Sequence, residues 1–491
     1  MALSRSLFAP GALGYGKLRH SCRTLCDAWE ASALTGGVRG TFEGSLAKWG
    51  FRVQVVVIGA GYLGTTHAAC MAQIGHSVLG IDISEEKVAK LQSGEVPFFE
   101  PGLEALLREH VASGRLRFST SFEEAAAFGD VHFLAVGTPQ STRGRAGDVS
   151  CVNAAIDSLS PHLARPTVIA GKSTVPVGTA RRLAERVQAA APAREAVEVA
   201  WNPEFLREGF AVEGTLRPDR IVVGAGDRPE GRAIELLREV YSLILAEGVP
   251  FLVTDLETAE LVKVAANAFL ATKVGFINAI AELCEAAGAD VAMLADAIGR
   301  DERIGRQYLN AGLGFGGGCL PKDIRALVAR AEELGVGDAF AFLREVDNGN
   351  MRQRSRVVDI SREICGSLIG TNVAILGAAF KPDTDDVRDS PALSVAGQLQ
   401  LQGANVSIYD PKAMDNARKT MPTLDYALTS LDACRGADIV LVLTEWKEFQ
   451  NIQPGDLGAV TQTKNIVDAR NCLDSRQWRA AGWTYRGLGR S

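Results

Sequence analysis

A run of β-branched residues that leads into a glycine turn constrains the fold of this chain most strongly. Val55, Val56, Val57 and Ile58 are followed directly by Gly59-Ala60-Gly61-Tyr62-Leu63-Gly64. β-Branched residues favour a buried strand, and three glycines at this spacing allow a tight turn into a closely packed helix. The pattern predicts the strand, turn and helix that begin a doubly wound α/β sheet.

An acidic residue at the end of the next predicted strand points to a ligand for this turn. Asp82 follows the run 77–81 and lies 18 residues after Gly64. A carboxylate here accepts hydrogen bonds from ribose hydroxyls and repels a 2′-phosphate, so NAD is favoured over NADP. We predict cofactor contacts from Gly59, Gly61, Leu63, Gly64 and Asp82. Lys87 is either a further contact on the adenosine side or a solvated helix lysine.

Alternating strands and helices follow this unit. Strand-like runs at 131–136, 167–170, 197–200, 221–223 and 251–253 predict a parallel sheet. A second α/β segment has strand-like runs at 372–376, 405–409, 439–443 and 465–467, and Gly377 and Asp410 repeat the turn and the acid. We interpret this segment as a second, incomplete nucleotide-binding-like domain.

A proline-free segment separates the two. Its apolar residues recur at helical spacing, which predicts one helix over 255–287, about 50 Å long, unless Gly275 interrupts it. Such a helix suits a spine between domains and a dimer surface. The predicted organisation is a disordered leader at 1–50, a dinucleotide-binding domain at 51–250, a central helical and dimerisation domain at 251–350, and a C-terminal Rossmann-like domain at 351–491.

Composition excludes several classes of function. The 491 residues carry a net charge of −6, which argues against a nucleic-acid surface. No apolar run reaches the roughly 18 residues of a membrane span, so no membrane partner is expected. Nine scattered cysteines without a CxxC pair predict reduced thiols in the cytoplasm and no metal site. No histidine follows His162, so catalysis in the C-terminal two thirds must use other residue types.

Lys263 and Asn267 are spaced i, i+4 on the predicted long helix. Both side chains are hydrogen-bond donors, and this spacing places them on one face, where they can hold a developing oxyanion. The spacing by itself favours the alternative, a solvated lysine and a helix-face asparagine. Apolar neighbours on both sides favour a partly buried lysine.

A glycine-rich loop at 312–318 leads into Cys319, Pro321 and Asp323. Proline suits the first turn of a helix, so Cys319 is expected just before a helix N-terminus, where the dipole lowers the pKa of a thiol. Asp323 lies in the first turn and is a candidate base. The alternative is a buried structural cysteine.

Three further segments end predicted strands at the edge where ligands bind in such sheets. The segment 202–209 carries Glu204 and Glu208, which otherwise serve as a helix cap and a surface residue. The segment 172–178 places Thr174 near the nicotinamide, and the charged segment 380–388 suggests a phosphate or cofactor site.

Together with Asp468-Ala469-Arg470, these motifs resemble those of the UDP-glucose 6-dehydrogenase family, within the UDP-glucose/GDP-mannose dehydrogenases, over about 51–490. The resemblance implies oxidation of a nucleotide sugar's primary alcohol to a carboxylate with two NAD. It implies that Cys319 is the nucleophile, forming first a thiohemiacetal and then a thioester. Water activated by Asp323, with help from Thr174 or Glu204, releases the acid, and Lys263 and Asn267 stabilise the oxyanions.

The resemblance also implies binding residues. The NAD contacts it adds are Thr138, Thr174, Glu208, Lys322 and Arg388. The nucleotide-sugar contacts are Glu204, Phe205, Leu206, Arg207, Glu208, Lys263, Asn267, Tyr308, Leu309, Asn310, Ala311, Gly312, Gly316, Lys381 and Arg470, with the C-terminal domain binding the nucleotide sugar. Arg303 resembles the arginine that reaches the neighbouring subunit's substrate, which implies a homodimer or a higher homo-oligomer.

Alternatives remain at this stage. Gly318-Cys319-Leu320 stands where the family often has Ser-Cys-Phe, so GDP-mannose and UDP-N-acetylmannosamine are alternative substrates, although residues 308–312 favour UDP-glucose. The Lys263 and Asn267 pair also resembles single-oxidation β-hydroxyacid dehydrogenases. A non-catalytic NAD-binding regulator is a third class. Two, one or no NADH per sugar distinguishes these three classes.

Overall fold

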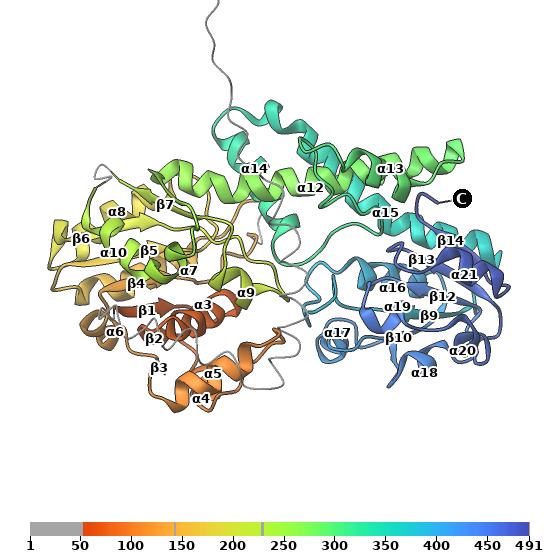
Figure 1. Ribbon diagram of the computed structural model, residues 1–491, viewed down its shortest axis with the longest axis horizontal. Coiled ribbons are helices and arrows are strands. Elements are labelled where there is room, and N and C mark those ends of the chain that lie inside the picture. Colours follow the sequence, from red (N-terminus) through yellow and green to blue (C-terminus); the bar gives the residue numbers. More distant parts are fainter. Residues whose placement is uncertain (1–52, 142–143, 227–229, 491) are drawn as a thin grey trace, which may run out of the picture. The chain divides into compact units, whose positions relative to one another are not determined.

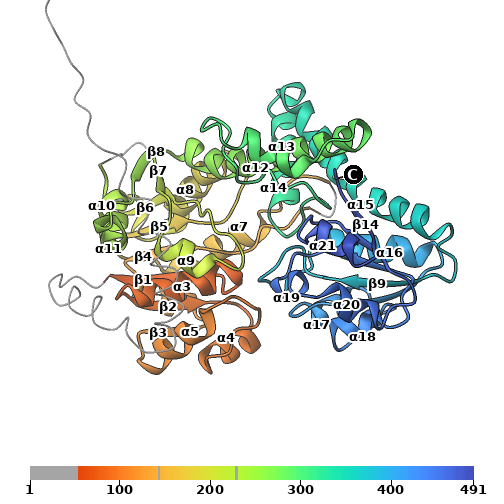
Figure 2. The same ribbon diagram turned by 45° about the vertical axis from the view of Figure 1, so that its right-hand side comes forward.

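The computed structural model describes residues 53–141, 144–226 and 230–490. The predicted leader at 1–50 lies outside the described residues. Two α/β sheets are connected in the chain by the helices α12 to α15, and Figures 1 and 2 show them from two directions. The predicted α/β fold class, with two Rossmann-type sheets and a central helical segment, is confirmed.

The first sheet has eight strands in the order β3-β2-β1-β4-β5-β6-β7-β8. Their bounds are β1 Gln54–Ile58, β2 Ser77–Ile81, β3 Leu116–Ser119, β4 Val131–Leu134, β5 Thr167–Gly171, β6 Val197–Trp201, β7 Ile221–Ala225 and β8 Phe251–Asp255. All neighbours are parallel except β6 and β7, which are antiparallel. The sequence missed β3 and this reversal of direction.

Helices cover both faces of this sheet. Val55 and Val57 of β1 pack in a cluster with α3 and α10, whereas Val56 and Ile58 pack in another with α7 and α8. The helices are α3 Tyr62–Gln73, α4 Glu85–Gln92, α5 Leu103–Ala112, α6 Phe122–Phe128, α7 Ser150–Leu159, α8 Thr179–Ala190, α9 Ala211–Leu216, α10 Arg232–Val240 and α11 Ser242–Ala246. Because β1 is buried on both sides, its run of β-branched residues shows no alternation.

The second sheet has six strands, all parallel, in the order β11-β10-β9-β12-β13-β14. They are β9 Asn372–Leu376, β10 Asn405–Tyr409, β11 Asp425–Tyr426, β12 Ile439–Val442, β13 Asn465–Asp468 and β14 Thr484–Gly487. This is the full strand order of a dinucleotide-binding sheet, so the interpretation as an incomplete domain is wrong. Two strands were missed because β11 is two residues long and β14 is largely polar.

The glycine turn and the aspartate of the first sheet recur in the second sheet, but the two aspartates have different hydrogen-bond partners. Gly59 and Gly377 both have positive φ, 98° and 110°. The Asp82 carboxylate accepts hydrogen bonds from the amides of Ala60 and Ser84 and from Lys87. The Asp410 carboxylate, 1% exposed, accepts five, from the amides of Ala378, Ala379, Lys412 and Ala413 and from the Trp446 indole. Asp410 therefore has no acceptor capacity left for a ribose.

Helix α12 (Leu256–Ala287) confirms the predicted long helix. Gly275 does not interrupt it; a Cβ there would lie 3.2 Å from Val346, so the glycine allows α15 (Ala341–Cys365) to pack closely. The remaining central helices are α13 Val291–Ile298 and α14 Leu320–Glu333. The predicted domain boundary at 350 falls inside α15.

Helix α12 also corrects an expectation from composition. By length and hydropathy it is the one helix of the described residues that qualifies as a membrane span, although no such apolar run was expected. It packs against β7, α14 and α15, and it buries Glu260, Lys263, Asn267 and Asn278. These contacts and buried polar side chains are those of a helix inside a folded domain.

The five hydrogen bonds of Asp410 generate a prediction. Replacing Asp410 by Asn puts an amide group among five donors, so we expect the free energy of unfolding to fall by about 2–4 kcal/mol. Denaturant unfolding measures this loss. Asp415→Asn, at a largely exposed carboxylate on α17 (Met414–Thr420), is the control and should leave stability unchanged. Equal stability of both variants would contradict the structural role of Asp410.

Candidate active site

Three buried polar residues on one face of α12 reach three other segments. Glu260 accepts hydrogen bonds of 2.6 Å from the amides of Gly178 and Ala180 at the start of α8. The Lys263 ammonium lies 2.9 Å from the Glu204 carboxylate, in the loop after β6. The Asn267 amide donates a 2.6 Å hydrogen bond to Asp323 on α14. The spacing i, i+3, i+7 places all three side chains on the same face.

Cys319 is the residue directly before α14 and its side chain forms no capping hydrogen bond, and Asp323 lies in the first turn of this helix. Asp323 is buried, and its carboxylate also forms a 2.7 Å ion pair with the Lys322 ammonium. Gly318 lies against the Arg388 guanidinium, since a Cβ at Gly318 would be 2.4 Å from Arg388 Cζ. The structure therefore brings together the thiol, the two predicted donors and the predicted acid.

The expectation that the pKa of Cys319 is lowered is wrong. The Cys319 side chain is accessible to solvent, yet the surrounding protein desolvates the thiol and raises its pKa to about 12. Glu204 raises the pKa further, while Lys263 lowers it. The Lys263 ammonium is paired with the Glu204 carboxylate, so the negative charge of Glu204 offsets part of the stabilisation that Lys263 gives to a Cys319 thiolate.

A second group of charged residues links the loop after β6 to the second α/β segment. Glu208 accepts a 3.0 Å hydrogen bond from Thr384 and a 3.1 Å contact from Arg388. Its backbone carbonyl accepts a hydrogen bond from Lys381. Burial, followed by the charge of Asp386, raises the pKa of Glu208 to about 7. The predicted contacts Glu208, Lys381 and Arg388 therefore lie in one cluster.

The glycine turn leaves room for a dinucleotide. A Cβ at Gly59 would lie 2.8 Å from the Ala135 carbonyl, whereas a Cβ at Gly61 would meet no atom within 4 Å. Gly61 therefore faces the open space that a pyrophosphate needs, at the N-terminus of α3. Leu63 lies in the first turn of α3, and Thr138 is buried in the loop that follows β4. These residues fit NAD.

Sequence reasoning missed Glu100, a buried carboxylate that connects the glycine turn to the loop after β6. Glu100 accepts hydrogen bonds of 2.6 and 2.7 Å from the amides of Gly209 and Ala211, and one from the Tyr62 hydroxyl. Tyr62 is the first residue of α3, and its hydroxyl accepts a hydrogen bond from the Gly209 amide. No local pattern marks this role, because all of its partners are distant in the sequence.

Several predicted substrate contacts have other partners. Arg303 is highly exposed and pairs with Asp301. Arg470 donates to the backbone carbonyls of Leu443, Gly314 and Phe380, which ties the glycine-rich loop to the second sheet. In the predicted segment 308–312, the buried residues are Leu309, Ala311 and Gly312. Tyr308 has positive φ, and the Asn310 side chain accepts a hydrogen bond from Arg306. Gly316 is also buried.

Comparison with known proteins decides the family. The NAD binding domain, central domain and UDP binding domain of the UDP-glucose/GDP-mannose dehydrogenase family match residues 53–245, 257–352 and 374–475. The chain belongs to this family.

Relatives within the UDP-glucose/GDP-mannose dehydrogenase family cover nearly the whole described chain. The UDP-glucose 6-dehydrogenase of Rhizobium meliloti is 42% identical over 89% of this chain and 100% of its own length. A solved UDP-glucose dehydrogenase from Pyrobaculum islandicum is 37% identical with a TM-score of 0.83, covering 90% of this chain and 98% of its own. A UDP-D-ManNAc dehydrogenase from Pyrococcus horikoshii is 26% identical with a TM-score of 0.77, covering 89% and 99%.

The two glycines of the turn generate a paired prediction. Gly59→Ala forces a positive-φ residue against the Ala135 backbone, so we expect a loss of about 1–3 kcal/mol in stability. A Cβ at Gly61 would meet no described atom within 4 Å, and φ is −80°, so Gly61→Ala should leave stability unchanged. The added methyl group projects toward the pyrophosphate, so we expect NAD affinity to fall at least about tenfold. Thermal unfolding and NAD titration measure both. Unchanged NAD affinity in Gly61→Ala would contradict this placement of the cofactor.

Proposed function

We propose that this chain oxidises UDP-glucose to UDP-glucuronate in two NAD-dependent steps through a thioester on Cys319. The observation that carries the proposal is the meeting of Cys319, the Lys263–Glu204 pair and the Asn267–Asp323 pair at one site. A single oxidation of an alcohol needs no nucleophile. A thiol beside two donors and an acid suits capture of the aldehyde and its further oxidation.

The residues have distinct roles in this proposal. In the first oxidation the alcohol loses a hydride and a proton, and Lys263 and Asn267 donate to the oxygen. The Cys319 sulfur then bonds to the aldehyde carbon, and the oxygen takes up the thiol proton to give a thiohemiacetal. Loss of a second hydride and the hydroxyl proton gives the thioester, and water cleaves the carbon–sulfur bond. NAD, when bound, accepts the hydrides and brings a positive charge that favours a thiolate.

A small cavity supports Asp323 as the base for hydrolysis. Its volume is about 20 Å³, and Thr174, Lys322 and Asp323 are among its lining residues. A cavity of this size holds about one water molecule. Asp323 uses two acceptor positions on Asn267 and Lys322, and a carboxylate has about four. Neither Glu204 nor Cys319 lines this cavity, so Thr174 and Glu204 both remain candidates for the helper.

The relatives support the choice of substrate. The two named for UDP-glucose are 42% and 37% identical, whereas the UDP-D-ManNAc enzyme is 26% identical. We assign NAD binding to 51–250, the central role to 251–350 and nucleotide-sugar binding to 351–491, with the contacts that the family resemblance implies. Turnover of a panel of UDP-glucose, GDP-mannose and UDP-N-acetylmannosamine tests this choice, and a faster reaction with either of the other two would contradict it.

We also propose that the enzyme is a cytoplasmic homodimer that acts in polysaccharide biosynthesis. Phe269, Phe276 and Leu283 are exposed at seven-residue intervals on α12, so they form one apolar stripe. Arg303 is exposed and available to a second copy. Light scattering that gives a monomeric mass for the active enzyme would contradict the dimer.

Cys319→Ser tests the proposed function. A serine hydroxyl is far less ionised than a thiol and its ester is a poorer intermediate, so steady-state turnover should fall by about 100-fold or more. We expect a trapped covalent adduct or a small release of aldehyde. Intact-protein mass spectrometry detects the adduct, and an aldehyde trap detects the release.

Cys151→Ser is the matched control, because Cys151 is an exposed cysteine on α7 of the first domain. It should retain wild-type turnover. If Cys319→Ser produces the acid at the wild-type rate, Cys319 is not the nucleophile. A single oxidation is indicated only if the wild-type enzyme releases the aldehyde with one NADH per sugar.

A further inference from the structure

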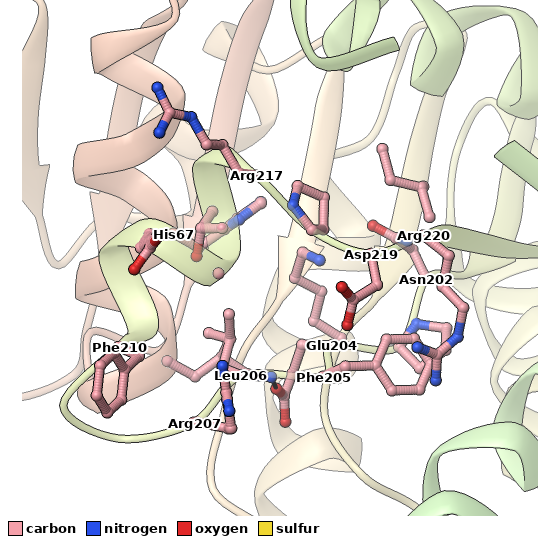
Figure 3. Close-up of a pocket in the computed structure, with 18 of the residues that line it drawn as sticks. His67, Asn202, Glu204, Phe205, Leu206, Arg207, Phe210, Arg217, Asp219 and Arg220 are labelled. Atoms are coloured by element: carbon pink, nitrogen blue, oxygen red, sulfur yellow. Dashed lines mark hydrogen bonds between the residues drawn. The ribbon is translucent and has the colours of Figure 1, made fainter. Parts of the chain in front are cut away.

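A cavity of about 270 Å³ lies in the first domain beside the loop that follows β6. Its walls come from α3, α9, the segment 202–207 and the segment 217–221, with Lys172 from the end of β5. Figure 3 shows His67, Asp219 and Arg220 around it, with Glu204 and Phe205 below. The cavity is separate from the small cavity at Thr174 and Asp323, and Cys319 does not line it. Its lining includes Glu204, the ion-pair partner of Lys263.

Lys172 is the feature of this cavity that needs explanation. Its side chain is 7% exposed, and among the described residues no hydrogen bond or ion pair is found for its ammonium. Its neighbours are the ring faces of Phe133 and Tyr241, with the ammonium 5.5 and 5.9 Å from the ring centres. Burial lowers the pKa of Lys172 to about 8, although the negative charge of Glu204 opposes this shift. A buried ammonium is costly without an acceptor, so a partner from outside the protein is expected here.

His67 presents a second nitrogen without a hydrogen-bond partner to the same cavity, among the residues that the structure describes. The side chain is 2% exposed, and its Nε2 has no hydrogen-bond partner. Its ring packs edge-on against Phe133 at 4.5 Å between centres, which fixes its orientation. Burial, and then the charge of Lys172, lowers the pKa of His67, so the ring is neutral and offers one N–H.

The charges of the lining determine the sign of the ligand. Besides Lys172, the basic residues are Arg207, Arg217 and Arg220. Arg220 stacks on Phe205 at 3.8 Å, which holds its guanidinium in place. The acidic residues are Glu204, Glu213 and Asp219, and Glu204 already forms the ion pair with Lys263. Four cations therefore face two acids that remain available.

We propose that this cavity binds a small oxyanion, a phosphate or a carboxylate, held by the Lys172 ammonium and the His67 N–H. Both groups are buried, and among residues 53–141, 144–226 and 230–490 neither has a hydrogen-bond acceptor, although the Glu204 charge lies near Lys172. An oxyanion supplies acceptors to the two together. The volume lies just below that of drug-sized ligand pockets, so the ligand is smaller than a nucleotide. The site goes beyond the proposed function, since Cys319 does not lie in its lining. The lining shares Leu63 with the predicted cofactor contacts and residues 204–207 with the predicted substrate contacts, so the site adjoins the proposed catalytic site.

Calorimetric titration of the full-length enzyme tests the site. Inorganic phosphate and malonate are titrated separately at pH 7, with chloride at matched ionic strength as the blank. We expect saturable binding of at least one of them, and the two arms distinguish a phosphate from a carboxylate ligand. Lys172→Met should weaken that binding at least tenfold. Lys90→Met, at an exposed lysine of α4, is the control and should bind as the wild type does.

The proposal is overturned if neither anion binds saturably, or if Lys172→Met binds the anion as well as the wild type does. It is also overturned if saturating UDP-glucose displaces the anion, because the anion would then lie in the catalytic site. Should Lys172→Met fail to fold, the wild-type crystal structure soaked in sulfate gives an independent answer. A sulfate within hydrogen-bond distance of Lys172 Nζ supports the site, and water alone there contradicts it. These measurements need no turnover, so a failure of the proposed activity leaves them unaffected.

Discussion

The buried polar face of α12 is the constraint on which the rest of the structure depends. Glu260, Lys263 and Asn267 are buried, and burial of such groups is tolerated only when each one is paired. Their partners belong to the start of α8, the loop after β6 and the first turn of α14. One helix thus fixes the relative positions of three segments that carry the proposed chemistry. Removing one partner leaves the other buried and unpaired, which is costly. Such a network therefore favours one arrangement of the helix and the three segments over all others.

The two sheets show how one architecture serves different purposes. Both have a positive-φ glycine after the first strand and an aspartate after the second. Asp82 accepts three hydrogen bonds and lies beside Gly61, which faces open space. Asp410 accepts five and is saturated. The same turn is therefore suited to a dinucleotide in the first sheet and serves as an internal brace in the second.

Sequence patterns predicted the elements whose signal is local. Strand β1 was recognised from its run of β-branched residues before a glycine turn, and α12 was recognised from its helical periodicity. Strands β3 and β11 were missed because four and two residues carry too little pattern. The reversal between β6 and β7 was missed because strand direction depends on the connection and not on the residues within the strand.

In the candidate site too, some features were expected from the sequence, and those that depend on distant residues were not. The shared site of Cys319, Lys263 and Asp323 was expected from the resemblance to the family, since the residues lie on two different helices, α12 and α14, or next to one of them. The direction of the Cys319 pKa was not, because it depends on desolvation and on the pairing of Lys263 with Glu204 from a distant loop. Glu100 was missed for the same reason, since its three partners come from α3 and the segment 209–211.

The central claim is that one site carries out two successive oxidations without releasing the aldehyde. Counting NADH formed per UDP-glucose consumed tests it most directly, with limiting sugar, excess NAD and an aldehyde trap present. Two NADH for each UDP-glucuronate and no trapped aldehyde are expected. One NADH per sugar, with the aldehyde recovered in the trap, would contradict it.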